Sequence, residues 1–280
     1  MQFNKPKDLN ELLENLSISQ KKNYFLAGGT DINVQIKKEF IKDGNFYYIN
    51  EIDELNGIKR KNEKVHVGAL TTYRELLESD TISEHFPFLQ RSLTNFASPL
   101  LTTMATIGGN IANGSPTNDV TPPLLVLDAE LELISVAGIR NVSLTSFFTG
   151  YKKSLLKKDE IIKGVVLSIQ AENGYETLYK KVGARKTLTI AKVALAGLKK
   201  IKEGKIDEIK LAVGSLNEYP RRLDKLEEYL NNIMIRDINK NTIDEILSKE
   251  ITPISDLRSD KEYRYRVCLN LILSFLGINH

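Results

Sequence analysis

Two short glycine-containing segments hold the residues best suited to bind a ligand. The first, from Phe25 to Ile32, reads Phe-Leu-Ala-Gly-Gly-Thr-Asp-Ile; the second, from Thr106 to Pro123, begins Thr-Ile-Gly-Gly-Asn and is rich in small polar residues. Because glycine has no Cβ, a bulky anion can approach the amides of Gly108 and Gly109, and successive exposed amides form an anion-binding concavity. The second segment contains no Lys or Arg. Dipoles and hydroxyls would therefore hold the anion, which suits a diphosphate inside a larger ligand.

Side chains in the second segment add hydrogen-bonding groups of two kinds. Thr106, Asn110 and Ser115 offer neutral donors, whereas the carboxylate of Asp119 only accepts. An acceptor in such a segment suits a sugar hydroxyl or a ring N–H. We therefore expect Asp119 to hold a polar group of the same ligand.

The first segment has the sequence pattern of a strand, a glycine turn and a helix N-terminus. Apolar residues at 24–26 precede the two glycines, and Ile32, Ile36 and Phe40 follow at helical spacing. This arrangement favours phosphate binding, because the first amides of a helix have no partner within the helix. Either Thr30 or Asp31 could cap the helix, which we expect to end near residues 40–43.

The composition is that of an ordinary globular protein whose chemistry belongs to a bound cofactor. The net charge of +3 is small and the lysines are scattered, so we set nucleic-acid binding aside. A single cysteine, Cys268, cannot hold an iron–sulfur cluster, and the three histidines have no partner at metal-ligand spacing. No run is long and apolar enough to span a membrane, and no secretory leader is present, so we expect a cytoplasmic protein without a metal site of its own.

The apolar patterns predict an α+β chain in two domains. The domain of residues 1–170 divides into subdomains at 1–54 and 55–170, and the second domain, 171–280, has an antiparallel meander followed by helices. Strands are predicted at 24–26, 46–49, 65–70, 129–136, 140–144, 160–169, 175–182, 191–201 and 206–216. Helices are predicted at 8–16, 71–77, 87–97, 223–233, 242–247 and 261–276, with a short helical or extended segment from 122.

The two glycine segments together carry a resemblance. Ala-Gly-Gly-Thr-Asp, followed later by Thr-Ile-Gly-Gly-Asn-Ile-Ala-Asn-x-Ser-Pro-x-x-Asp, resembles the FAD-binding subunit of the molybdenum hydroxylases, the xanthine dehydrogenase and carbon monoxide dehydrogenase group. Residues 147–151, 155–162, 179–191 and 256–264 are similar to further stretches of that family. The resemblance implies a two-subdomain FAD-binding domain of the PCMH, or vanillyl-alcohol-oxidase-like, type, followed by a smaller α+β C-terminal domain.

The resemblance also implies a site. Ser115 would add a hydroxyl near the FAD diphosphate, Asp119 would hold a polar group, and Phe96 would pack close to the cofactor. Ile162 and Lys181 would lie near the isoalloxazine, where the Lys181 cation would stabilise anionic reduced flavin. The residues lining the diphosphate would be Phe25, Leu26, Ala27, Gly28, Gly29, Thr30, Asp31, Ile32, Thr106, Ile107, Gly108, Gly109 and Asn110.

The function implied by the resemblance is electron transfer within a larger enzyme. The chain would bind FAD non-covalently, receive electrons from a small [2Fe-2S] subunit next to a large molybdenum-cofactor subunit, and pass them to NAD or another acceptor. Some relatives have acidic residues in the loop that here reads Lys186-Thr187-Leu188-Thr189, so the acceptor stays open. Two alternatives are a free-standing flavin-dependent reductase of the same fold and a scaffold without cofactor.

Overall fold

The N-terminal subdomain is a small parallel sheet covered by one helix. The computed structural model describes residues 1–94, 96–185 and 188–278. Strands β1 (Gln2–Asn4), β3 (Asn45–Tyr48) and β2 (Asn23–Leu26) lie in that order, so β2 forms an edge. Helix α1 (Leu9–Ile18) begins at Asp8, whose carboxylate accepts a hydrogen bond from the amide of Glu11, and it buries four leucines in the core. The predicted strand–glycine turn–helix arrangement follows at α2 (Ile32–Lys37).

The second subdomain is a five-stranded antiparallel sheet with helices on one face. The order is β4 (Ile58–Lys61), β5 (Lys64–Gly68), β10 (Ile161–Ser168), β6 (Glu130–Ser135) and β7 (Gly138–Ser143). Alternate residues such as Val65, Leu131 and Val165 point into the helix layer. The helices of this subdomain are α3 (Tyr73–Glu78), α4 (Asp80–His85), α5 (Pro87–Leu93), α6 (Pro99–Thr102), α7 (Ile107–Asn113), α8 (Thr121–Val126) and α9 (Leu144–Phe147), and α9 leads into the hairpin of β8 (Phe148–Gly150) and β9 (Lys153–Ser154).

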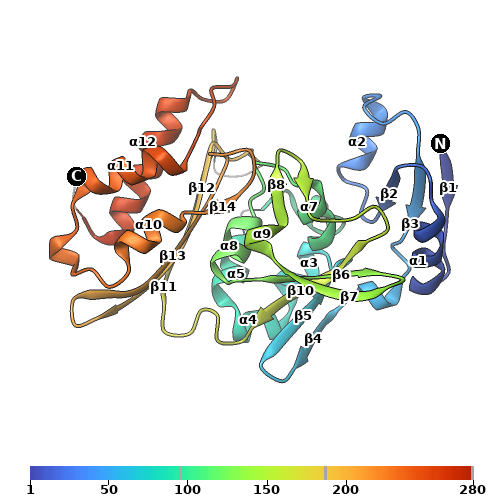
Figure 1. The fold of residues 1–280 in the computed structure, drawn as a ribbon, viewed down its shortest axis with the longest axis horizontal. Coiled ribbons are helices and arrows are strands. Elements are labelled where there is room, and N and C mark those ends of the chain that lie inside the picture. The colour runs from blue at the N-terminus through green and yellow to red at the C-terminus, as the bar shows by residue number, and fades with distance from the viewer. Residues whose placement is uncertain (95, 186–187, 279–280) are drawn as a thin grey trace.

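The C-terminal part has a meander with helices on its outer face (Figure 1). Strands β11 (Glu176–Val182), β12 (Val193–Lys202), β13 (Lys205–Gly214) and β14 (Arg221–Arg222) form an antiparallel sheet. Helices α10 (Asp224–Leu230), α11 (Lys240–Glu250) and α12 (Lys261–Leu276) close a second core with it, and α8 packs against its other face. The expected α+β class, with the antiparallel sheet and its helices last, is confirmed.

Several predicted elements have different bounds in the structure, and three of the differences bear on the glycine segments and the helices beside them. The helix after the first glycines ends at Lys37, because Glu39 adopts a left-handed conformation (φ 58°), and Phe40 is 76% exposed. The helix predicted at 87–97 ends at Leu93, before Ala97 with φ 51°. The segment after Thr106, which we expected to be a loop, forms helix α7. In each case a single backbone turn, which apolar spacing does not encode, decides where the helix begins or ends.

Charged side chains lock the C-terminal sheet onto α8. The guanidinium of Arg222 donates to both oxygens of Glu227 at 2.6 Å and to Asp128 Oδ1 at 2.7 Å. Lys210 reaches the other oxygen of Asp128 at 2.6 Å. Together these contacts tie β13 and β14 to the end of α8. Within the described residues, no helix is both long and apolar enough to cross a membrane.

Candidate functional site

The two glycine segments meet in space. A Cβ added to Gly28 would lie 1.6 Å from the carbonyl oxygen of Met104, two residues before Thr106. Only glycine allows so close an approach of two backbones. The turn after β2 therefore lies directly against the chain that leads into α7. This contact brings the two segments together.

The first segment presents unpaired backbone donors. Within the described residues, the amides of Gly28, Gly29, Thr30 and Asp31 have no hydrogen-bond acceptor. Gly29 adopts φ 69°, which turns the chain sharply at this point. The predicted cap of α2 is absent, because the Asp31 carboxylate accepts from the Gln35 amide instead of from the helix backbone. The free donors of this turn are the arrangement that binds an anion.

The second segment contributes space where we expected free amides. The amide of Gly108 donates to the carbonyl of Ala69 at 2.9 Å, and that of Gly109 donates to the Thr106 hydroxyl at 3.2 Å. These amides are used to begin α7 and to hold it on the end of β5, so the expectation of free donors here was wrong. Gly109 is nevertheless exposed, and a Cβ added there would meet only Thr106 Oγ1, at 2.9 Å. The surface beside Gly109 is thus open to a ligand held by the first turn.

Asp119 and Lys181 form a buried ion pair between the two domains. Lys181 Nζ on β11 lies 2.5 Å from Asp119 Oδ2, and the two side chains are 9% and 12% exposed. The hydroxyl of Tyr179 on the same strand donates to the Asp119 carbonyl at 2.8 Å. Burial raises the pKa of the Asp119 carboxyl, and the Lys181 cation partly offsets this rise. The pair therefore places one positive and one negative group side by side in a nearly dry setting.

Several buried polar atoms of the second subdomain have no hydrogen-bond partner in the described chain. They are Asp119 Oδ1, Asn110 Oδ1, Thr121 Oγ1 and the hydroxyl of Tyr73. Burial, with a further contribution from the nearby Asp119 charge, raises the pKa of Tyr73 well above 10. Native interiors rarely leave such atoms unsatisfied.

Sequence reasoning named Asn110 and Asp119 but missed Tyr73. Tyr73 begins α3, far from both glycine segments in sequence, and its ring packs on Phe96 with centroids 4.2 Å apart. Its amide donates to the carbonyl of Ala105, which brings it next to Thr106. No spacing rule connects these positions. The only available signal was the Thr72–Glu75 capping box, which located the helix without giving the direction of the tyrosine.

The remaining named residues lie near the site without direct ties to the ion pair. The Ser115 hydroxyl shares a hydrogen bond with Thr117 at 3.1 Å. Ile162 is buried on β10, the strand against which α7 packs. Within the described residues, no hydrogen bond links either side chain to Asp119 or Lys181. Residues 186–187, in the loop where some relatives have acidic residues, lie outside the described residues.

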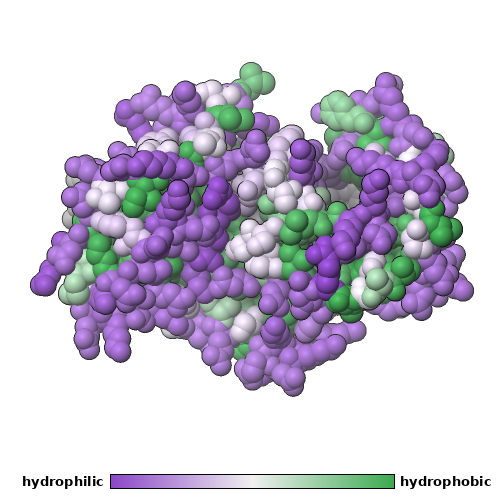
Figure 2. Space-filling model, viewed as in Figure 1, coloured by the Kyte–Doolittle hydropathy of each residue, from purple (hydrophilic) through white to green (hydrophobic). Residues whose placement is uncertain are grey.

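Space for an elongated ligand lies between the subdomains. Figure 2 shows the surface hollowed between the lobe that carries α2 and the central part that carries α7. The free amides of the first turn suit a diphosphate, and the unpaired oxygens near Asp119 suit hydroxyl or ring N–H groups. These residues fit a dinucleotide such as FAD, which carries all three kinds of group.

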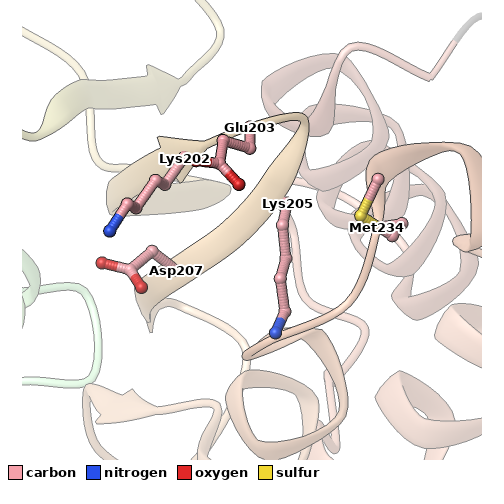
Figure 3. Close-up of a pocket in the computed structure, with 5 residues that line it drawn as sticks. All are labelled: Lys202, Glu203, Lys205, Asp207 and Met234. Carbon is pink, nitrogen blue, oxygen red and sulfur yellow. The ribbon is translucent and has the colours of Figure 1, made fainter.

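A second hollow, of about 270 Å³, lies at the β12–β13 turn (Figure 3). Its walls combine two lysines with two acidic side chains, and they are Lys202, Glu203, Lys205, Asp207 and Met234. The hollow is far from Lys181 along the sheet, because Lys181 pairs with Ala194 near the start of β12, whereas the hollow lies at the end of β12. The opposing charges largely cancel, so this hollow does not suit a diphosphate.

Family models match both parts of the chain. Residues 1–167 match the FAD binding domain in molybdopterin dehydrogenase, and residues 178–277 match the CO dehydrogenase flavoprotein C-terminal domain. The chain is 32% identical to the glyceraldehyde dehydrogenase medium chain of Sulfolobus acidocaldarius, over 86% of this chain and 85% of that protein. It is 30% identical to the xanthine dehydrogenase FAD-binding subunit of Escherichia coli O157:H7, over 85% and 82%.

Solved structures give the same fold. The carbon monoxide dehydrogenase of Hydrogenophaga pseudoflava contains a chain that matches with a TM-score of 0.89 and 24% identity, covering 97% of this chain and 94% of that one. Quinoline 2-oxidoreductase from Pseudomonas putida matches with a TM-score of 0.86 and 20% identity, covering 99% and 97%. The order of the two domains is thus shared along nearly the whole length.

Proposed function

The chain belongs to the family of FAD-binding subunits of the molybdenum hydroxylases, and we propose that it is the electron-transfer subunit of such an enzyme. In this proposal it takes electrons from a partner [2Fe-2S] subunit next to a large molybdenum-cofactor subunit. It passes them to NAD or another acceptor. The observation that carries the proposal is the row of unpaired amides at Gly28–Asp31, held by close packing of Gly28 against Met104, two residues before the second glycine segment.

The glycine turns would position the diphosphate. Four free amides of the first turn would donate to its oxygens, and the helix that follows begins with an uncapped, electropositive end. The exposed Gly109 leaves the ligand room to approach α7. Neither segment carries a Lys or Arg side chain, so backbone and hydroxyl dipoles alone would hold the diphosphate.

The ion pair would tune the other end of the ligand. When bound, FAD supplies the redox chemistry, and the chain supplies position and electrostatics. Lys181 would stabilise negative charge that develops nearby, and the free Oδ1 of Asp119 would accept a hydrogen bond from a donor on the ligand. Because Asp119 holds the Lys181 ammonium in place, the cation would meet the ligand at a fixed position.

The lone cysteine supports both the partner subunit and non-covalent binding. A [2Fe-2S] cluster needs several thiolates, so this chain would need a partner to deliver electrons. Cys268 lies in the core of the C-terminal domain, and burial raises the pKa of its thiol to about 12. A thiol in that position is not available to attach a flavin.

The test is a spectrum followed by reconstitution. The chain purified alone should be yellow or become yellow with added FAD, and acid should release FAD intact. Mixed with its iron–sulfur and molybdenum subunits, the flavin should be reduced when the substrate of the complex is added. Failure to bind FAD, alone or in the complex, would overturn the proposal. Turnover by the isolated chain with a reductant and a substrate would instead support a free-standing reductase.

A further inference from the structure

We propose that Arg264, on α12, is a positioning residue for the ion pair between Asp119 and Lys181. The two side chains of the pair come from different domains, so their alignment depends on how the C-terminal sheet is held against the second glycine segment. Arg264 acts on them through the backbone of Lys192 and of Ser215, each of which is hydrogen-bonded to one side of the pair. The inference rests on the proposed function, because the position of the Lys181 cation matters for electron transfer only if FAD binds beside it.

The guanidinium of Arg264 is buried and holds two main-chain carbonyls with one nitrogen. The residue is 2% exposed, and its Nη1 donates to the carbonyl of Ser215 at 3.0 Å and to that of Lys192 at 3.3 Å. Its Nη2 lies 2.8 Å from Asp256 Oδ1, which supplies the opposite charge. A buried guanidinium is costly unless it is paired and hydrogen-bonded. Because Lys192 directly precedes β12 and Ser215 directly follows β13, the bonded guanidinium holds two neighbouring strand ends together.

The contact with Lys192 leads to Lys181. The amide of Lys192 donates to the carbonyl of Val182 at 2.8 Å, and Val182 is the last residue of β11. Lys181 directly precedes Val182 on that strand. The position of Lys192 therefore determines where the end of β11 lies, and with it the origin of the Lys181 side chain.

The contact with Ser215 leads to Asp119. Ser215 adopts a left-handed conformation (φ 67°), which is uncommon for a residue other than glycine. In this conformation its amide donates to the Pro116 carbonyl at 2.8 Å, and its hydroxyl and carbonyl are hydrogen-bonded as well. Beside it, a Cβ added to Gly214 would lie 3.3 Å from the carbonyl oxygen of Asn118. The end of β13 thus packs on the residues just before Asp119.

The first experiment measures how fast the Lys181 amine of the apoprotein reacts with an acetylating reagent, sulfo-N-hydroxysuccinimide acetate, with each site resolved by tandem mass spectrometry. In the unsubstituted chain this buried, paired amine should react slowly. In Arg264→Met its rate should rise about 10-fold, the factor that corresponds to a pair weakened by about 1.4 kcal/mol. Two lysines serve as internal references whose rates should not change. They are Lys180, which is exposed, and Lys199, which is buried on the same sheet with its amine bonded to the Phe275 carbonyl.

Two further variants separate positioning from stability. Leu247→Ala removes a buried side chain of the same core, outside these hydrogen bonds, so it should lower the unfolding temperature without changing the Lys181 rate. Arg264→Lys keeps a cation near Asp256 without the planar fork, so it should raise the Lys181 rate less than Arg264→Met does. It also serves if Arg264→Met does not fold. An unchanged Lys181 rate in the folded Arg264 variants, or a rise that Lys199 shares, would overturn the inference.

The reduction potential of bound FAD gives a second readout. The potential of Arg264→Met should shift toward that of Lys181→Met, and the double variant should shift no further than Lys181→Met, because both changes act through the same cation. If Lys181→Met shifts the potential and Arg264→Met does not, the inference is overturned. If the unsubstituted chain binds no FAD, or Lys181→Met leaves the potential unchanged, the proposed function fails instead. The acetylation rates, which need no FAD, then still decide whether Arg264 positions the pair.

Discussion

Replacing Gly109 by leucine separates ligand binding from folding. A Cβ at this position meets only the Thr106 hydroxyl, at 2.9 Å, and faces open space otherwise. Leucine is favoured over glycine in a helix by about 1 kcal/mol, and a disturbed Thr106 cap costs about the same. The free energy of unfolding of the apoprotein should therefore change by less than about 1 kcal/mol. A leucine side chain would occupy the space next to the proposed diphosphate, so FAD affinity should fall by at least about 100-fold, or about 3 kcal/mol.

The assay is FAD titration of the apoprotein, monitored by flavin fluorescence, together with urea unfolding of the same sample. Gly28→Ala is the contrasting variant, because its Cβ would lie 1.6 Å from the Met104 carbonyl and would force the two glycine segments apart. Gly28→Ala should lose stability and FAD together, whereas Gly109→Leu should lose only FAD. If Gly109→Leu bound FAD normally while remaining folded, the diphosphate would not lie beside α7.

Three further outcomes are expected. Lys181→Met should lower the two-electron reduction potential of bound FAD by about 30 mV, which corresponds to 1.4 kcal/mol. Lys180→Met, which changes the exposed neighbouring lysine, should leave the potential unchanged. Equal potentials in both variants would contradict the role of the Lys181 cation. Burial raises the pKa of Glu172 from 4.5 to about 7, so the folded chain binds this proton more tightly than the unfolded chain does. The free energy of unfolding should then fall as pH rises from 4.5 to 7, by up to about 3 kcal/mol. In urea unfolding, Glu172→Gln should lack this fall. If the variant lost stability with pH as the unsubstituted chain does, other groups would be responsible for the pH dependence. Arg222→Met should lower the free energy of unfolding by about 3 kcal/mol, because it leaves the buried carboxylate of Glu227 unpaired. A loss of less than about 1 kcal/mol in chemical denaturation would refute this prediction.

Local patterns in the sequence were sufficient to predict several elements around the site, although α7 was not among them. Four leucines at helical spacing after Asp8 predict α1, and alternation around His66 predicts β5, because one face of each is buried. What the patterns supplied was the type and order of elements, together with the residue types at the turns.

The patterns could not predict which backbone groups remain free. The amides of Gly108 and Gly28 lie in similar sequences, yet the first is taken by the Ala69 carbonyl and the second has no partner in the described chain. That difference depends on contacts between distant segments, which periodicity does not record. The burial of the Tyr73 hydroxyl was unpredictable for the same reason, because it depends on how α3 packs on Phe96 and Ala105.

The site requires both domains although both glycine segments lie in the first. Lys181 and Tyr179 reach Asp119 from a strand of the C-terminal sheet, and the amide of Ser215 in the C-terminal domain donates to the Pro116 carbonyl at 2.8 Å. A ligand that contacts Asp119 therefore senses how the two domains are docked. A ligand that binds the docked domains more tightly than the separated domains also stabilises the docked arrangement. The stabilisation grows with the logarithm of the ligand concentration once that concentration exceeds the dissociation constant. If FAD binds between the glycine segments and Asp119 as proposed, it would therefore also stabilise the contact between the two domains, in addition to the hydrogen bonds of Arg222 that already join them.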